Sequence, residues 1–165
     1  STGFRQLTLF DHNDASTQIP CDAQPTLDLL VLESPQTLRT ADYHRIPRQA
    51  GLHAGAPALK RAWEKVQEAC MTQSPYRLGE AATLSAIASQ TLLPKPDFDD
   101  LLSLVEECGI YGVNVAHSGS VVGLMLDRNK DDVDYVKWLL AKKQLTRHWP
   151  EQHLLRMVKG GVTLL

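Results

Sequence analysis

The sequence lacks long apolar runs and a strong excess of either charge. No apolar stretch reaches the roughly 18 residues that a membrane-spanning helix needs, so no such helix is expected. Lys and Arg number 17 against 19 Asp and Glu, which gives a formal net charge of −2. This balance argues against a general binder of nucleic acid or of membrane surfaces. A strand-like pattern starts within the first few residues, so we expect no signal peptide.

Cysteine is scarce and metal-binding patterns are missing. Cys21, Cys70 and Cys108 are widely spaced and form no Cys-x-x-Cys pair, which favours a reducing, cytoplasmic compartment and structural roles for all three. The six histidines show no zinc-binding spacing. Residues 11–14 (Asp-His-Asn-Asp) lack the later Gly and Glu of a calcium loop and are typical of a turn. We therefore expect no metal site.

What the sequence contains is typical of an α+β domain. Its 165 residues, 43% of them apolar, are enough for one domain, or for one domain plus a fragment of another. Alternation predicts a strand over 4–10, and an apolar run predicts a strand over 27–33 that is buried on both faces. Residues 39–58 are predicted to be irregular. Helices are predicted over 59–70, 75–93, 98–108 and 133–143, a β-hairpin over 112–127, and one or two last strands over 153–165. This order predicts an antiparallel sheet with helices on one face.

The predicted hairpin carries the strongest functional signal. Its two apolar runs flank the tight polar turn His117-Ser118-Gly119-Ser120. Gly119 supplies the backbone freedom that a turn needs. Small side chains and backbone N–H groups allow an anionic group to approach closely. A plain hairpin with a polar tip is the alternative interpretation.

Residues 76–127 resemble the C-terminal half of the GHMP kinases, the family of galactose, homoserine, mevalonate and phosphomevalonate kinases. The shared pattern is a helix, a proline-containing loop, a second helix, a Gly-x-x-Gly segment (109–112), a strand, a small-residue turn and a second strand. The Ala-His-Ser-Gly-Ser form of the turn resembles the propanediol-utilisation branch, which phosphorylates L-threonine for cobalamin side-chain synthesis. Glu80-Ala81-Ala82, Ser85 and Ser89-Gln90 also resemble that branch.

The resemblance implies a ferredoxin-like C-terminal lobe over 36–165, preceded by remnant strands of an N-terminal lobe over 1–35. It implies transfer of the γ-phosphoryl group of ATP, with Mg²⁺, to a small hydroxyl substrate, with L-threonine as the first choice. The turn of this family helps to line the phosphoacceptor end of the cleft. Its implied substrate and phosphate contacts here are Ala116, His117, Ser118, Gly119 and Ser120.

Other parts of a kinase are absent from the sequence. It has no Walker A motif, no Gly-x-Gly-x-x-Gly and no Pro-x-x-x-Gly-x-Gly-Ser-Ser nucleotide loop. The catalytic residues are therefore expected in an N-terminal half, and this chain alone is expected to be inactive and to hold no cofactor tightly. Arg39 and Tyr43 are further candidates for substrate contacts, because an arginine can neutralise a phosphate or a carboxylate. A solvated loop is the alternative for these two residues.

Two other classes of function stay open on the sequence. One is a stand-alone ligand-binding or regulatory α+β module of the kind that binds amino acids. The other is a structural interaction domain, in which sheet edges exposed by a missing lobe would drive homodimer formation. Neither nucleic acid nor a membrane is an expected partner.

Overall fold

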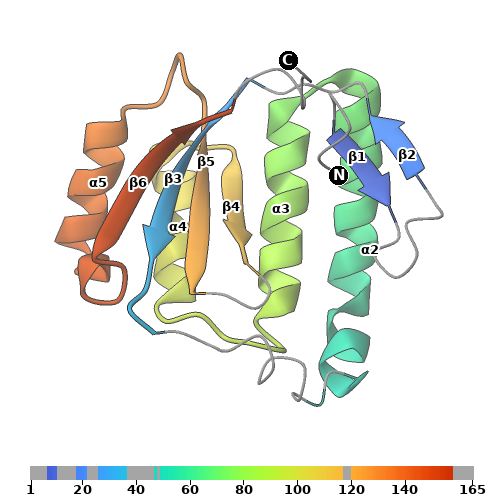
Figure 1. The fold of residues 1–165 in the computed structure, drawn as a ribbon, viewed down its shortest axis with the longest axis horizontal. Helices are drawn as coiled ribbons and strands as arrows, with labels where there is room; N and C mark the ends of the chain where they lie inside the picture. Colours follow the sequence, from blue (N-terminus) through green and yellow to red (C-terminus); the bar gives the residue numbers. More distant parts are fainter. Residues whose placement is uncertain are drawn as a thin grey trace, which may run out of the picture.

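A four-stranded antiparallel sheet forms the centre of the fold (Figure 1). The computed structural model describes residues 7–10, 18–21, 26–36, 47, 49–116 and 120–157. The strand order is β4–β5–β3–β6, so every strand pairs with a neighbour of opposite direction. The strands are β3 (Asp28–Glu33), β4 (Gly112–Val115), β5 (Val121–Leu126) and β6 (Glu151–Arg156). The α+β fold with an antiparallel sheet is thus confirmed, and so is the predicted hairpin of β4 and β5.

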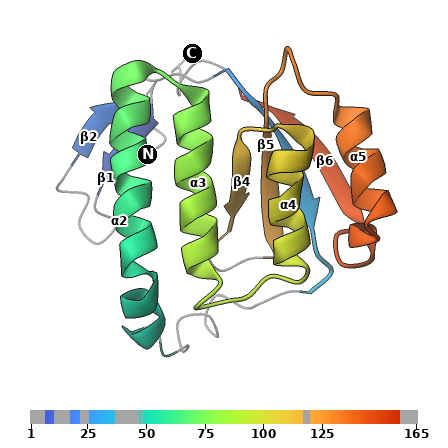
Figure 2. The ribbon, with the colours of Figure 1, turned by 180° about the vertical axis from the view of Figure 1, so that it is seen from behind.

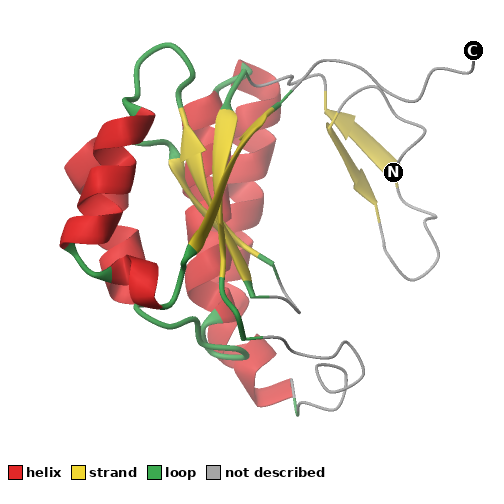
Figure 3. Ribbon diagram, turned by 60° about the vertical axis from the view of Figure 1, so that its left-hand side comes forward, coloured by secondary structure: helices red, strands yellow, loops and turns green. Residues whose placement is uncertain are grey.

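Two helices cover one face of this sheet. They are α4 (Phe98–Cys108) and α5 (Val133–Lys142), and Figures 2 and 3 show them packed against the strands. Along β3, Leu30 and Leu32 point into the core that α4 and α5 close, while Leu29 and Val31 between them are only half-buried. The prediction that this strand is buried on both faces was therefore wrong. Its apolar residues supply one core face and one more open face.

Local sequence signals explain where these helices begin and end. The Asp132 carboxylate accepts hydrogen bonds from the N–H groups of Asp134 and Tyr135, which caps α5. Gly109 ends α4 in the left-handed conformation with φ +67°, which glycine adopts readily. The covered core includes Leu101, Leu104, Val113, Val122, Leu124, Leu126, Val136, Leu140 and Trp149.

A second helical pair flanks the free edge of β4. It consists of α2 (Gln49–Thr72) and α3 (Pro75–Ser89), which lie side by side in Figures 1 and 2. The helix α2 starts ten residues before the predicted boundary at 59, so part of the segment predicted to be irregular is helical. Its buried positions are the small residues Gly55, Ala62 and Ala69, whereas the predicted inward residue Leu59 is 37% exposed. Close packing of two helices favours small side chains at the contact, and a search for large apolar residues misses them.

Four charged side chains tie α2 to α3. Arg77 lies 2.8 Å from Glu68 and 2.5 Å from Glu80, and Lys65 lies 2.9 Å from Glu68. All four are about a third exposed, so each pair contributes little by itself. Hydrogen bonding to Lys65 and the neighbouring charge of Arg77 lower the pKa of Glu68.

A separate two-stranded ladder pairs β1 (Leu7–Phe10) with β2 (Gln18–Cys21). Both strands lie within residues 1–35, which the resemblance assigns to an N-terminal lobe. The strand β3 lies within the same segment, yet it is hydrogen-bonded between β5 and β6 in the central sheet.

The cysteines differ from their predicted common role. Cys70, half-buried on α2, takes part in a disulfide, whereas Cys108 at the end of α4 keeps a free thiol. Burial raises the pKa of the Cys108 thiol, as expected for a small side chain beside a core. The cysteines therefore give no support to a reducing compartment.

Candidate functional site

One end of the sheet brings together three connections. The strand β4 ends there at Val115, β5 begins there at Val121, and β3 ends there at Glu33 (Figure 1). The Ala116 N–H donates to the Val121 carbonyl at 3.0 Å, and the Ser34 N–H donates to the Ser120 carbonyl at 2.8 Å. We call this end of the sheet, with the connections that meet there, the turn end. Both arms of the turn are therefore fixed to the sheet by backbone hydrogen bonds.

The predicted site residues fall partly within the described structure. Ala116 is exposed and Ser120 is half-buried, and each flanks the turn as expected. His117, Ser118 and Gly119 lie outside the described residues, and so do Arg39 and Tyr43. The role of all seven residues in binding stays a prediction.

A tight contact between α3 and β4 sets the position of the hairpin. A Cβ atom on Gly79 would lie 2.1 Å from the Tyr111 carbonyl oxygen, and one on Gly112 would lie 2.3 Å from the Gly79 carbonyl oxygen. Only glycine fits at either position. Thr83 Oγ1 accepts from the Val113 N–H at 3.0 Å and donates to the Gly79 carbonyl at 2.9 Å. The helix thus covers the edge of the sheet that the hairpin would otherwise leave open.

The connection between α3 and α4 also lies at the turn end, because α4 begins where β4 finishes (Figures 1 and 2). Its backbone is held by Gln90, whose Oε1 accepts from the Lys95 N–H at 2.7 Å. The amide nitrogen of Gln90 donates in turn to the Ala86 carbonyl at 2.8 Å. Pro94 and Pro96 restrict the backbone on both sides of Lys95.

The last residue of this connection adopts a costly conformation. Asp97 precedes α4 with φ +53° in the left-handed region, and its side chain makes no capping hydrogen bond to the helix. Its carboxylate instead lies 2.5 Å from Nδ1 of His148, which follows α5 along the chain. The pair joins two connections that are 51 residues apart in the sequence.

Lys95 is one of only two charged residues that are buried in the described part of the chain; the other is Asp28. Lys95 is 8% exposed and Asp28 is 5% exposed. The burial of Asp28 has a structural explanation, since the Arg128 guanidinium donates to its carboxylate and also to the Met157 carbonyl. Burial lowers the pKa of the Lys95 ammonium. In the sequence, only the place of Lys95 between two prolines sets it apart from other lysines.

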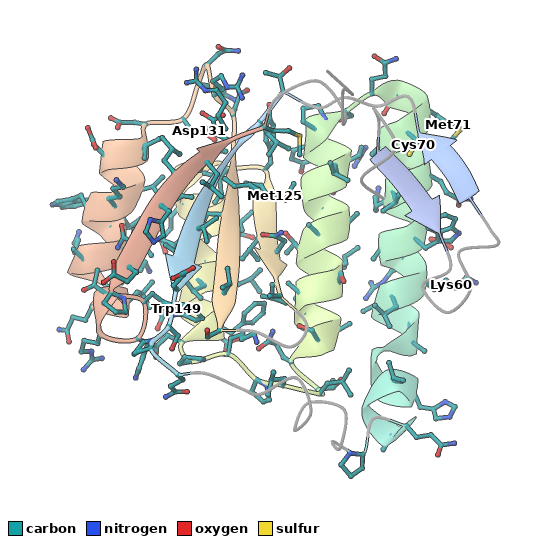
Figure 4. All side chains as sticks on the ribbon, in the orientation of Figure 1. Lys60, Cys70, Met71, Met125, Asp131 and Trp149 are labelled. Atoms are coloured by element: carbon teal, nitrogen blue, oxygen red, sulfur yellow. The ribbon has the colours of Figure 1, made fainter. Side chains whose placement is uncertain are left out.

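A second polar cluster lies at the opposite end of the hairpin. The Tyr111 hydroxyl donates to Asp127 at 2.8 Å, and the Asp127 N–H donates to Asp131 at 2.7 Å. Burial, followed by the bond to Asp127, raises the pKa of Tyr111 to about 12. Burial also raises the pKa of Asp131, whose side chain is labelled in Figure 4. These bonds close the loop between β5 and α5, far from the turn.

The described residues hold no group of three or more His, Cys, Asp or Glu side chains that could bind a metal ion. Within the same residues, no helix has both the length and the apolar character needed to cross a membrane.

Comparison with known families and proteins gives consistent matches. Residues 57–138 match the family described as "GHMP kinases C terminal". The chain is 82% identical over 164 residues to an L-threonine kinase of Citrobacter freundii, and 71% identical over 164 residues to an L-threonine kinase of Salmonella typhimurium. Each match covers 99% of this chain, but only 57% and 55% of the relatives. The chain therefore spans little more than half the length of the curated relatives it matches.

Solved structures of more distant proteins share the fold. A mevalonate kinase of L. major superposes with a TM-score of 0.68 at 14% identity, over 92% of this chain and 48% of that protein. A homoserine kinase of Cytophaga hutchinsonii gives 0.64 at 14% identity, over 93% and 48%. A galactokinase of Lactococcus lactis gives 0.60 at 11% identity, over 99% and 53%. At these identities the likeness establishes the fold alone.

Proposed function

The chain belongs to the GHMP kinase family, whose C-terminal domain it carries, and from this premise we propose that it forms the C-terminal part of an ATP-dependent L-threonine kinase. The observation that carries the proposal is the 82% identity over 164 residues to an L-threonine kinase. The match extends over 164 residues, which is 99% of this chain, so it spans the α3–α4 connection and the sheet as well as the turn. A stand-alone binding module would not be expected to match a kinase over 99% of its length.

The proposed reaction transfers one phosphoryl group. The hydroxyl oxygen of L-threonine attacks the γ-phosphorus of ATP, the bond from that phosphorus to the β–γ bridging oxygen breaks, and ADP leaves with the electron pair. The hydroxyl proton passes to a base or to solvent, and the product is O-phospho-L-threonine. Such a transfer depends on positioning and on stabilisation of charge rather than on covalent catalysis by the protein. Mg²⁺ would neutralise the charge that develops on the phosphate oxygens.

The contribution of this chain would be the wall of the site at the turn end. Backbone N–H groups and hydroxyls of the turn Ala116–Ser120 are suited to hold an anion or the acceptor hydroxyl. Arg39 and Tyr43 stay candidates for substrate contacts. The nucleotide loop and the catalytic residues would lie in the remaining part of the protein, and residues before Asp28 would belong to that lobe. We further propose that the product serves cobalamin side-chain synthesis, as the resemblance implies.

The test uses the full-length protein encoded by the gene that contains these 165 residues. It is incubated with ATP, Mg²⁺ and L-threonine, and the products are followed by phosphorus NMR. The proposal predicts equal amounts of ADP and O-phospho-L-threonine. ADP without the phosphorylated amino acid, or no turnover at all, would contradict it. In parallel, the 165-residue chain alone is expected to bind ATP with a dissociation constant in the millimolar range or above. A micromolar dissociation constant would contradict the proposal that the nucleotide loop lies in the remaining part of the protein.

We also propose that the isolated chain forms a homodimer through the β6 edge of its four-stranded sheet. In the four-stranded sheet, α3 lies against the β4 edge, and β6 is the strand at the other edge. Leu154 and Leu155 on β6 are about half exposed. Sedimentation of the chain alone is expected to show a dimer that the substitution Leu155→Lys converts to monomer. A monomer at all concentrations would contradict this proposal.

A further inference from the structure

Arg128 joins separate segments of the chain at one end of the central sheet. It lies in the connection between β5 and α5, and its Nε donates to the Asp28 carboxylate at 2.8 Å. Its Nη2 donates to the Leu27 carbonyl at 3.2 Å and to the Met157 carbonyl at 2.8 Å. Leu27 directly precedes β3 and Met157 directly follows β6, at the end of the sheet opposite the turn end (Figure 1). We call these contacts the Arg128 clamp.

The clamp extends the pairing of β3 with β6 beyond their ladder. The last pair of that ladder is Asp28 with Arg156. Beyond it, the Met157 N–H donates to the Leu27 carbonyl at 3.2 Å, so this carbonyl accepts from two donors. Leu27 is 1% exposed and Asp28 is 5% exposed, although both lie where the chain enters the sheet. The path of the backbone into β3 is therefore fixed by buried side chains and by hydrogen bonds.

These contacts exceed what is needed to neutralise Asp28. One cation can neutralise a carboxylate, and Arg156 also lies 3.8 Å from the same carboxylate oxygen. The planar guanidinium group of an arginine has several N–H donors in fixed directions, so it can bind a carboxylate and backbone carbonyls at the same time. A carbonyl has no net charge, and binding it fixes the backbone. The clamp thus holds the entry to β3 and the exit from β6 in addition to pairing Asp28.

The clamp also links the matched family domain to residues outside the match. Arg128 lies within the matched range 57–138, whereas Leu27 and Asp28 precede this range and Met157 follows it. Under the proposed function, the residues before Asp28 belong to the lobe that holds the nucleotide loop. The rate of an enzyme whose site is shared between two lobes depends on their relative position. A shift of about 1 Å caused far from the reacting atoms can lower such a rate about 100-fold.

We propose that Arg128 is a positioning residue of the kinase, which fixes the entry of the chain into β3 and so holds this domain in a set orientation to the rest of the enzyme. The inference rests on the proposed kinase function. Without the clamp, the nucleotide lobe still binds ATP, but the two lobes align poorly for transfer of the phosphoryl group. The expected signature is a lower kcat at an unchanged KM for ATP.

The decisive variant combines Asp28→Leu with Arg128→Leu in the full-length protein, and we call it the double variant. It removes the clamp without leaving a buried charge unpaired. Arg128→Lys keeps a positive charge beside Asp28 but lacks the planar fork, so it tests the backbone contacts in a second way. The matched control is Arg156→Gln, since Arg156 lies near the same carboxylate and is 65% exposed. Urea unfolding first establishes that each variant is folded under the conditions of the kinetic assay.

Steady-state constants are measured for ATP and L-threonine. The double variant is expected to lower kcat by about 10- to 100-fold, while KM for ATP changes by less than about twofold. Arg128→Lys is expected to give an intermediate kcat, and Arg156→Gln to match the wild type. Hydrogen exchange gives a readout without turnover. The Met157 N–H is expected to exchange about tenfold faster in the double variant, with the Leu124 N–H in the middle of β5 unchanged.

Three results would overturn the inference. The first is a kcat of the folded double variant within about twofold of the wild type, because the clamp would then serve stability alone. The second is a fall in kcat with an equal rise in KM for ATP, because the nucleotide site itself would then be disturbed. The third is unchanged exchange of the Met157 N–H. A wild type that transfers no phosphoryl group, with the expected change in exchange, would refute the proposed function and leave the role of Arg128 at the entry to β3 standing.

Discussion

Replacing Gly79 by alanine tests the contact that positions the hairpin. The new Cβ atom would lie 2.1 Å from the Tyr111 carbonyl oxygen and 2.4 Å from its carbonyl carbon, and both are backbone atoms. Since backbone cannot rotate away, α3 has to move off β4. That movement would also break the hydrogen bond from the Val113 N–H to Thr83.

The size of the effect follows from three contributions. Overpacking costs about 1–3 kcal/mol, and the lost hydrogen bond costs about 1 kcal/mol. Alanine gains about 1 kcal/mol over glycine inside a helix. The Gly79→Ala variant is therefore expected to lose about 1–3 kcal/mol of unfolding free energy.

Urea unfolding followed by circular dichroism measures this loss. The matched control is Gly55→Ala in α2, where the nearest atom to a new Cβ is the Ala88 Cβ at 3.3 Å. That contact is tight but close to ordinary packing, so the helix propensity should leave the control as stable as the wild type or more stable. A Gly79→Ala protein as stable as the control would refute the account of this contact.

Three further predictions concern other parts of the fold. Asp28→Ala leaves the Arg128 guanidinium without its carboxylate and is expected to lower the free energy of unfolding in urea by about 3 kcal/mol. The double variant Asp28→Leu with Arg128→Leu is expected to recover part of this loss. A loss below about 0.5 kcal/mol for the single variant would contradict the prediction. Gly109→Ala places a side chain at φ +67° and is expected to cost about 1 kcal/mol in the same assay, although open space surrounds it; an unchanged midpoint would contradict the strain. The alkaline titration curves of the wild type and of Tyr111→Phe are expected to differ by one phenol that ionises near pH 12, because the folded-state pKa of Tyr111 is raised from 10.0 to about 12. Its stabilising contribution is thus complete below pH 10 and is lost as the pH rises towards 12; an ordinary phenol titration for Tyr111 would contradict its burial beside Asp127.

Much of the fold could be predicted from local patterns. The apolar run around Leu30 and the helical spacing of Phe98, Leu101 and Val105 predicted elements that the structure confirms. Gly109 is the helix end expected for a glycine after the last helical residue, whereas the capping role of Asp132 became visible only in the structure. These signals depend on neighbours in the sequence, so they can be read without the fold.

The sequence-based predictions were least complete where segments that are far apart in the sequence pack together. The buried face of α2 consists of glycine and alanine, whose burial depends on how closely α3 approaches. The placement of β3 between β5 and β6 joins strands more than 80 residues apart, and no local pattern predicts it. Within the candidate site, the turn could be selected from its small polar residues. The burial of Lys95 could not be predicted, because the exposure of a charged side chain in a connection depends on the folded structure around it.

The central proposal is that this chain is the C-terminal part of an L-threonine kinase, and the acceptor specificity of the full-length protein tests that proposal most directly. The full-length protein is assayed for ADP formation with L-threonine, homoserine, mevalonate and galactose as separate acceptors, and kcat/KM is compared. We predict that kcat/KM for L-threonine exceeds that of every other acceptor by at least about 100-fold, since a site shaped to L-threonine leaves polar groups unpaired when the hydroxyl, ammonium or carboxylate of an acceptor is missing or lies at another position. A higher kcat/KM for any other acceptor, or none with L-threonine, would contradict it.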